Sequence, residues 1–344
     1  MGNKKTIGNL IFLLLVFGFT IYYVFHGEDL GAMMGYIKAA DVRFWIAGIV
    51  LVVLFILSES VIIYYMMRSV GQPVVLTHCF LYSFVGFFFS AITPSATGGQ
   101  PAQLYFMKKD NLSLSISTVI LMVVTITYKA VLVVLGLVVI IFRPPVIMYY
   151  LEPVMGWCYL GVALNVFCVA FMMLLVFHPT LAGNILITLI HIFCKFIHTK
   201  KEKKWTQRIE NAMERYRSVA DYFRQNKLVI VNVLVITFVQ RIIWFFITYL
   251  VYLSFTLHQL NPFSITALQG MISVSVDMLP LPGGMGISEK LFLSIFRPIC
   301  GEKLVLPVMV VSRGISYYTQ LIISALMTGV AYFTIRGVGE KNEQ

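Results

Sequence analysis

Long apolar stretches separated by short polar segments run through the whole chain of 344 residues. A helix that spans a bilayer needs about 20 apolar residues, and six of the stretches are long enough. They cover residues 6–26, 44–67, 114–142, 154–177, 229–256 and 304–334. This pattern predicts an all-α polytopic membrane protein with about six spanning helices.

Two shorter apolar runs differ from the others, because each ends directly in a segment rich in proline and glycine. Run 77–93 leads into TPSATGGQP, and run 263–279 leads into PLPGGMG. Proline removes a backbone donor and glycine favours non-helical conformations, so each helix is expected to end at its break. The charges of the loops decide whether these runs cross the membrane or turn back inside it.

The positions of the basic loops indicate that run 77–93 turns back inside the membrane and does not cross it. Cytoplasmic loops carry an excess of lysine and arginine, and the strongest basic region of this chain is 198–227. This region shares a side with Arg68 and Lys109 only if 77–93 enters the membrane and returns. By the same logic 263–279 dips in from the opposite side. We therefore expect two oppositely oriented re-entrant hairpins in a multi-pass cell-membrane protein, with both termini in the cytoplasm.

The hairpins divide a single membrane domain, residues 1–344, into two opposed units. The first unit covers about 44–142 and the second about 229–334, with a basic cytoplasmic connector at about 181–227. Transporters built from inverted repeats have this arrangement. The amphipathic connector could lie on anionic lipid, but an ordinary solvated connector is the interpretation we favour.

The composition agrees with an integral membrane protein. Charged residues make up 12% of the chain, against about 25% in soluble domains. The net charge of +11 crowds the membrane-proximal loops, so no nucleic-acid partner is expected. Five cysteines form no CxxC pair and six histidines form no HxxxH or HExxH pattern, so neither a metal nor a cofactor is expected. The N-terminal apolar run lacks a cleavage site and is expected to remain as the first helix.

The two breaks predict a polar cavity at membrane depth, since non-helical backbone there must be buried in protein or face water. Each return arm begins a short helix, and the N–H groups at a helix N-terminus favour anions such as phosphate. The alternative is that the hairpins only plug the bundle, with glycines selected for close packing.

Charged residues inside apolar segments are costly and usually functional. Arginine binds phosphate through two parallel hydrogen bonds, so Arg241 and Arg313 are the preferred phosphate ligands, with Lys129 beside them. Internal salt bridges are the alternative for each of these residues. The acidic candidates, which would hold a cationic part of the ligand, are Glu59, Asp277 and Glu289.

The breaks resemble the lysylphosphatidylglycerol synthase transmembrane family, through TPSATGGQPAQLYFMKKDNLS and the later DMLPLPGGMGISEKLF. The resemblance covers essentially the whole chain and includes Arg313. It implies translocation of aminoacylated phosphatidylglycerol or a related lipid to the outer leaflet, as in the flippase half of the bacterial multiple peptide resistance factor. In that factor the lysyl lipid gives resistance to cationic antimicrobial peptides. The binding residues that the motifs imply are Gly98, Gly99, Gln100, Pro101 and Gln103 in the first break, and Pro282, Gly283, Gly284, Gly286 and Glu289 in the second.

In two-part members of that family, a soluble C-terminal domain transfers lysine from lysyl-tRNA to the lipid. The sequence ends at RGVGEKNEQ after its last apolar run, so we expect a translocase that works with a separately encoded lipid synthase. A membrane-embedded or partner-dependent phosphatidylglycerol lysyltransferase component is the alternative, and a non-catalytic scaffold is a third. Transport would be downhill or coupled to protons or the membrane potential, with Asp277 or Glu289 as proton carriers. A homo-oligomer is compatible with the sequence.

Overall fold

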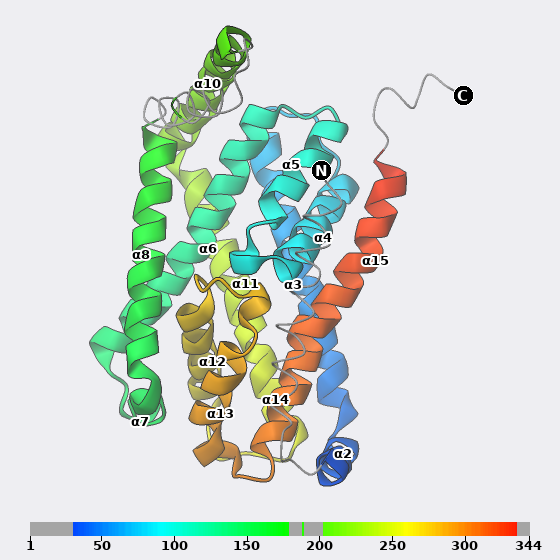
Figure 1. Cartoon of the computed structure of the whole chain (residues 1–344), viewed down its shortest axis with the longest axis vertical. Coiled ribbons are helices and arrows are strands. Elements are labelled where there is room, and N and C mark those ends of the chain that lie inside the picture. The colour runs from blue at the N-terminus through cyan, green and yellow to red at the C-terminus, as the bar shows by residue number, and fades with distance from the viewer. Residues whose placement is uncertain (1–29, 179–187, 189–201, 336–344) are drawn as a thin grey trace.

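The computed structural model describes residues 30–178, 188 and 202–335, and within these ranges every regular element is a helix (Figure 1). Four helical stretches are long and apolar enough to cross a membrane, with mean hydropathies from 2.2 to 2.8. They are α3 (Val42–Ser69), α6 (Leu114–Phe142), Pro145–Val176 and α11 (Lys227–Ser254). The stretch from Pro145 comprises α7 (Pro145–Leu151), η2 (Glu152–Val154) and most of α8 (Met155–Phe177). The expectation of a helical multi-pass membrane protein is confirmed.

Both short apolar runs form helices that stop at their breaks. The first hairpin consists of α4 (Leu76–Ile92), η1 (Pro94–Ala96) and α5 (Gly99–Lys109). The second consists of α12 (Pro262–Val276), η3 (Pro282–Gly284) and α13 (Ile287–Cys300). Figure 1 shows the two hairpins in opposite halves of the bundle, with their breaks facing each other at mid-height. Two segments distant in sequence therefore meet at the centre of the molecule.

The C-terminal apolar run is helical but not uniformly α-helical. It consists of α14 (Val305–Arg313), the π-helical turn η4 (Gly314–Tyr318) and α15 (Thr319–Thr334). The sequence predicted one uninterrupted span over 304–334, and the π turn is the difference. Such turns occur inside α-helices, often at functional sites. Here the turn follows Arg313 and contains Tyr317, whose hydroxyl donates to the carbonyl oxygen of Ala91 at 2.9 Å.

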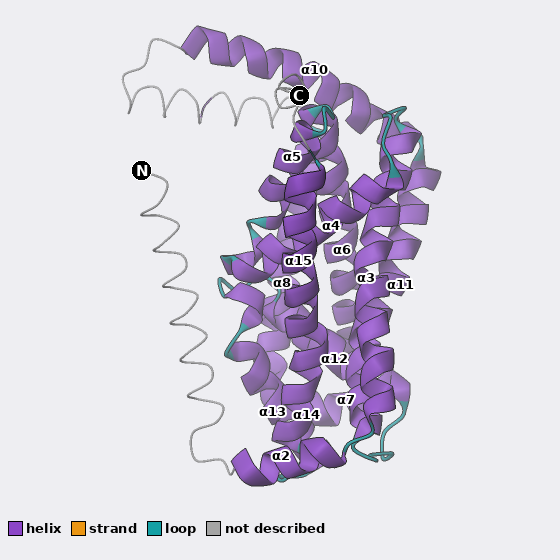
Figure 2. Ribbon diagram, turned by 90° about the vertical axis from the view of Figure 1, so that its right-hand side faces the viewer, coloured by secondary structure: helices purple, strands orange, loops and turns teal. Residues whose placement is uncertain are grey.

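Two helices lie across the ends of the bundle, α2 (Leu30–Ala39) at one end and α10 (Glu202–Gln225) at the other (Figure 2). Within α10, Val219 and Phe223 are buried while Arg217 and Arg224 are exposed. The helix therefore binds the bundle through one apolar face. The expected first span at 6–26 and nearly all of 181–201 lie outside the described residues.

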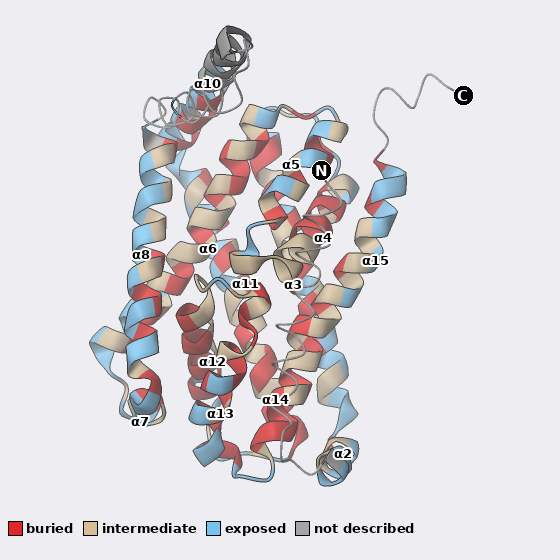
Figure 3. Ribbon diagram, viewed as in Figure 1, coloured by how far each residue is buried: buried red, intermediate tan, exposed pale blue. Residues whose placement is uncertain are grey.

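Each hairpin has its own apolar core. The first hairpin packs with parts of α3, α6 and α10 around Tyr82, Met107 and Ile120. The second packs with α3, α11 and α14 around Met271 and Phe296. Figure 3 shows the dense burial of α12 to α14 in particular. The two breaks lie between these cores, and polar side chains gather there.

Candidate functional site

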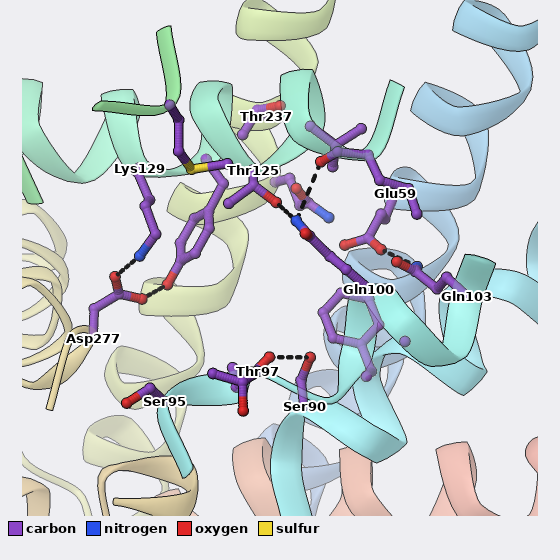
Figure 4. Close-up of a pocket in the computed structure, with 18 of the residues that line it drawn as sticks. Glu59, Ser90, Ser95, Thr97, Gln100, Gln103, Thr125, Lys129, Thr237 and Asp277 are labelled. Atoms are coloured by element: carbon purple, nitrogen blue, oxygen red, sulfur yellow. Dashed lines mark hydrogen bonds and ion pairs between the residues drawn. The ribbon is translucent and has the colours of Figure 1, made fainter. Parts of the chain in front are cut away.

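A cavity of about 370 Å³ lies beside the first break, lined mainly by α3, α4, α5, α6 and α11 (Figure 4). Its polar lining residues are Glu59, Ser90, Ser95, Thr97, Gln100, Gln103, Thr125, Tyr128, Lys129, Thr237, Gln240, Arg241 and Asp277. A second cavity of about 230 Å³ adjoins it beside the second break and shares Ser95, Tyr128 and Asp277. The second cavity is also lined by Gly283, Gly284, Ser288, Glu289, Arg313 and Tyr317. Together the cavities form a polar region between two apolar cores.

Two long helices each contribute a polar stripe to the first cavity. Residues three and four apart lie on one helix face, which aligns Thr125, Tyr128 and Lys129 on α6. The corresponding stripe on α11 consists of Thr237, Gln240 and Arg241. Charge identified Lys129 and Arg241 in the sequence, whereas the uncharged members of both stripes were not predicted. Their helical spacing within apolar runs is the signal that would have identified them.

Lys129 and Asp277 neutralise each other where the two cavities meet. The Lys129 Nζ lies 2.5 Å from the Asp277 Oδ2, and both side chains are largely buried, with exposed fractions of 11% and 10%. The Tyr128 hydroxyl donates to the other carboxylate oxygen of Asp277. Buried ions need such partners, so these three side chains join α6 to the end of α12.

Arg313 and Glu289 form a second neutralised pair, at the second break. The Arg313 Nε donates to the Glu289 Oε1 at 2.7 Å, and the Arg313 Nη2 donates to the carbonyl oxygen of Gly283 at 3.0 Å. The other oxygen of Glu289 accepts from the backbone N–H of Gly286 at 2.6 Å. The backbone N–H of Gly286 at the start of α13 is therefore bound by the chain's own carboxylate and is not free for a phosphate.

Arg241 differs from both other cations, because it forms no ion pair or hydrogen bond with the described residues. Its guanidinium lies over the ring of Tyr128, 3.8 Å from the centroid, and 4.8 Å from the centroid of Phe55. Its Nε is buried without a hydrogen-bond partner. Cation–π contacts stabilise the charge but leave the N–H donors of the guanidinium available to an anion.

Glu59 is the matching anion in the same cavity. Within the described part of the chain its carboxylate forms no ion pair and accepts one hydrogen bond, from the Gln103 Nε2 at 3.1 Å. Gln100 is held separately by Thr125 on α6. The first cavity thus holds one cation and one anion that attract each other without a direct ion pair. This arrangement suits a ligand that carries both a phosphate and an ammonium group.

Several residues expected at the site lie elsewhere. Gly98 and Pro101 line an apolar groove of about 510 Å³ beside α15. Gly99 allows close helix packing, since a Cβ there would lie 2.7 Å from the carbonyl oxygen of Gly86. Pro282 and Gly286 line neither cavity, and they shape the backbone of the second break instead. The structure brings the remaining expected residues to the two cavities.

The fold and the site define a class: a multi-pass helical membrane protein that holds a polar cavity between two opposed helical hairpins. The chain belongs to the lysylphosphatidylglycerol synthase TM region family, which it matches over residues 7–324. This membership confirms the resemblance noted in the two breaks. It indicates a role in the synthesis or translocation of lysylphosphatidylglycerol. A comparison with curated proteins found no match.

Proposed function

We propose that the protein translocates an aminoacylated or anionic phospholipid, such as lysylphosphatidylglycerol, between the leaflets of the cell membrane. The observation that carries this proposal is the unpaired guanidinium of Arg241 in a buried polar cavity. A buried cation without a partner is costly, and a phosphate headgroup would neutralise it. Glu59 faces the same cavity and would hold an ammonium group of the ligand.

The proposed topology has six spanning helices, with the two hairpins re-entrant and opposite in orientation. It is supported by the first hairpin's entry from the end of the bundle where α10 lies, while the second enters from the other end (Figures 1 and 2). Arg68 and Lys109, at the ends of α3 and α5, share the end of α10. We take this end and both termini as cytoplasmic.

The proposed path of the headgroup runs from one cavity to the other. The two breaks touch where the cavities adjoin: the Ser95 Oγ donates to the carbonyl oxygen of Leu279 at 3.2 Å. Tyr317 adds a second contact, from η4 to the end of α4. In this mechanism the breaks separate transiently while the headgroup passes, and the acyl chains remain in the lipid.

The test is leaflet exchange by purified protein in vesicles that contain traces of labelled phosphatidylglycerol and lysylphosphatidylglycerol, with the chemistry of each lipid followed in parallel. We expect faster exchange of unaltered lipid than in protein-free vesicles. Arg241→Ala should slow this exchange by about tenfold or more, because charge-assisted phosphate hydrogen bonds are lost.

Arg297→Ala is the matched control, because Arg297 is exposed near the end of α13. It should exchange lipid as the wild type does. Lipid that is chemically altered when lysyl-tRNA is supplied, without leaflet exchange, would instead establish a lysyltransferase component. Unchanged leaflet distribution and unchanged chemistry, with or without a lipid synthase added, would reject both functions.

A further inference from the structure

The three carboxylates that line the cavities are not equivalent. Asp277 has the Lys129 ammonium at 2.5 Å, and Glu289 has the Arg313 guanidinium at 2.7 Å. Glu59 has no cation within 4.0 Å among the described residues, and its one hydrogen bond comes from the neutral amide of Gln103. Of these carboxylates, Glu59 is the one that can gain a cation without breaking an existing ion pair.

The groups that face Glu59 across the cavity form no ion pair with it. From α11 Arg241 attracts the Glu59 carboxylate, but its guanidinium lies against the rings of Tyr128 and Phe55 and does not reach ion-pair distance. Lys129 on α6 and Asp277 neutralise each other. The lining residues from α4, α5 and α8 carry no charge, and neither does α15.

A carboxylate in these surroundings has two ways to avoid an uncompensated buried charge. It can take up a proton, or it can bind a cation from the ligand. The proton and the ligand cation compete, because both bind to the carboxylate oxygen atoms of Glu59. The Gln103 amide already occupies one of the hydrogen-bonding positions there.

Resting on the proposed translocase function, we infer that Glu59 is a cation-exchange site at which a proton and an ammonium group of the lipid headgroup alternate. When the headgroup enters the cavity, one proton leaves Glu59 for water on the side of entry, and the ammonium takes its place. When the headgroup leaves on the other side, Glu59 takes up one proton there. The empty site returns with that proton, so each lipid moves against one proton.

The exchange has a direction that can be measured. Protonation of Glu59 on the acidic side displaces the ammonium lipid there and prevents its return. With one proton exchanged per lipid, a gradient of one pH unit favours accumulation of about tenfold on the acidic side. A lipid without an ammonium group has nothing to exchange for the proton, so its distribution is expected not to follow the gradient.

The experiment uses the full chain in vesicles with a trace of labelled lysylphosphatidylglycerol, an imposed pH gradient and the membrane potential clamped to zero. Wild type should accumulate the labelled lipid in the leaflet that faces the acidic side, and a dye in the lumen should report the opposing proton movement. Labelled phosphatidylglycerol is the internal control and should distribute evenly. An even distribution of the lysyl lipid, despite rapid exchange, would overturn the exchange site while leaving the translocase intact.

Glu59→Gln keeps the shape of the side chain but cannot exchange a proton. In this variant the distribution of lysylphosphatidylglycerol should no longer respond to the pH gradient. The control Glu152→Gln, at an exposed position, should keep the response. A full gradient response in Glu59→Gln would also overturn the proposal. Absence of exchange of either lipid by wild type at any pH would reject the translocase itself, a distinct outcome.

Discussion

The two breaks share the order helix, short turn, helix, yet their glycines serve different purposes. In the second break Gly283, Gly284 and Gly286 have φ values of +57°, +67° and +85°, a region that favours glycine. In the first break Gly98 is right-handed with φ −82°, and the left-handed residues are Ser95 and Ala96. The paired glycines align in sequence but shape the backbone in one break and permit close packing in the other.

The charges around the breaks differ in the same way. Arg313 and Glu289 bind the backbone of the second break and neutralise each other. Arg241 and Glu59 beside the first break have no ion-pair partner among the described residues. One break is therefore held in place by the protein's own contacts, while the cavity at the other keeps charges available for a ligand.

Removal of Arg313 should have the largest effect, on stability. Arg313→Gln leaves Glu289 buried without its partner, and such changes typically cost about 3–5 kcal/mol. The free energy of unfolding in lipid–detergent mixtures measures this cost. Arg297→Gln is the control, because its pair with Glu302 is 3.6 Å long and exposed and should contribute less than about 1 kcal/mol. Equal stabilities of Arg313→Gln and Arg297→Gln would show that the ion pair of Arg313 does not hold the second break in place.

Gly283→Ala should destabilise the protein by about 2–4 kcal/mol, because the cost of a left-handed backbone and the cost of overpacking add together. A Cβ at Gly283 would overlap the ring of Tyr317. Gly71→Ala separates the two causes, since Gly71 has φ +73° but open space around it. This control variant should lose only about 1–2 kcal/mol of unfolding free energy in the same measurement. A Gly283→Ala variant as stable as wild type would show that the second break is not held rigidly.

Ser95→Ala should have the smallest effect, since it removes the single hydrogen bond to Leu279 at the contact of the breaks. The expected loss in unfolding free energy is about 0.5–1.5 kcal/mol, without slower lipid exchange, because the breaks must separate during transport. The matched variant is Ser294→Ala, because the Ser294 hydroxyl donates to the carbonyl oxygen of Lys290 within its own helix. Slower lipid exchange by Ser95→Ala than by wild type would contradict the proposal that the contact between the two breaks opens during transport.

Much of the fold could be predicted from apolar length and the two Pro-Gly segments. The helices at α3, α6, α8 and α11 and the ends of α4 and α12 follow from these features. The π turn η4 could not be predicted, because its apolar sequence is equally compatible with a continuous α-helix. The topology relative to the membrane stays a prediction.

The charged members of the candidate site were predictable, but their pairing was not. Glu59 and Arg241 could be identified as charged residues within apolar segments. The same signal identified the residues that form the two ion pairs. Which charges pair depends on the meeting of α6 with the end of α12 and of α13 with α14, contacts between segments far apart in the sequence. The pairing of Lys129 with Asp277 therefore required the structure.

The most direct test of the central claim is the affinity of the purified protein for phosphatidylglycerol, with Arg241→Gln compared against wild type and Arg297→Gln. The thermal stability of each variant, measured alongside, separates a binding effect from misfolding. Arg241→Gln should remain folded and bind the lipid about tenfold or more weakly, as expected for the loss of charge-assisted hydrogen bonds to phosphate. Binding by folded Arg241→Gln that equals wild type would contradict the account.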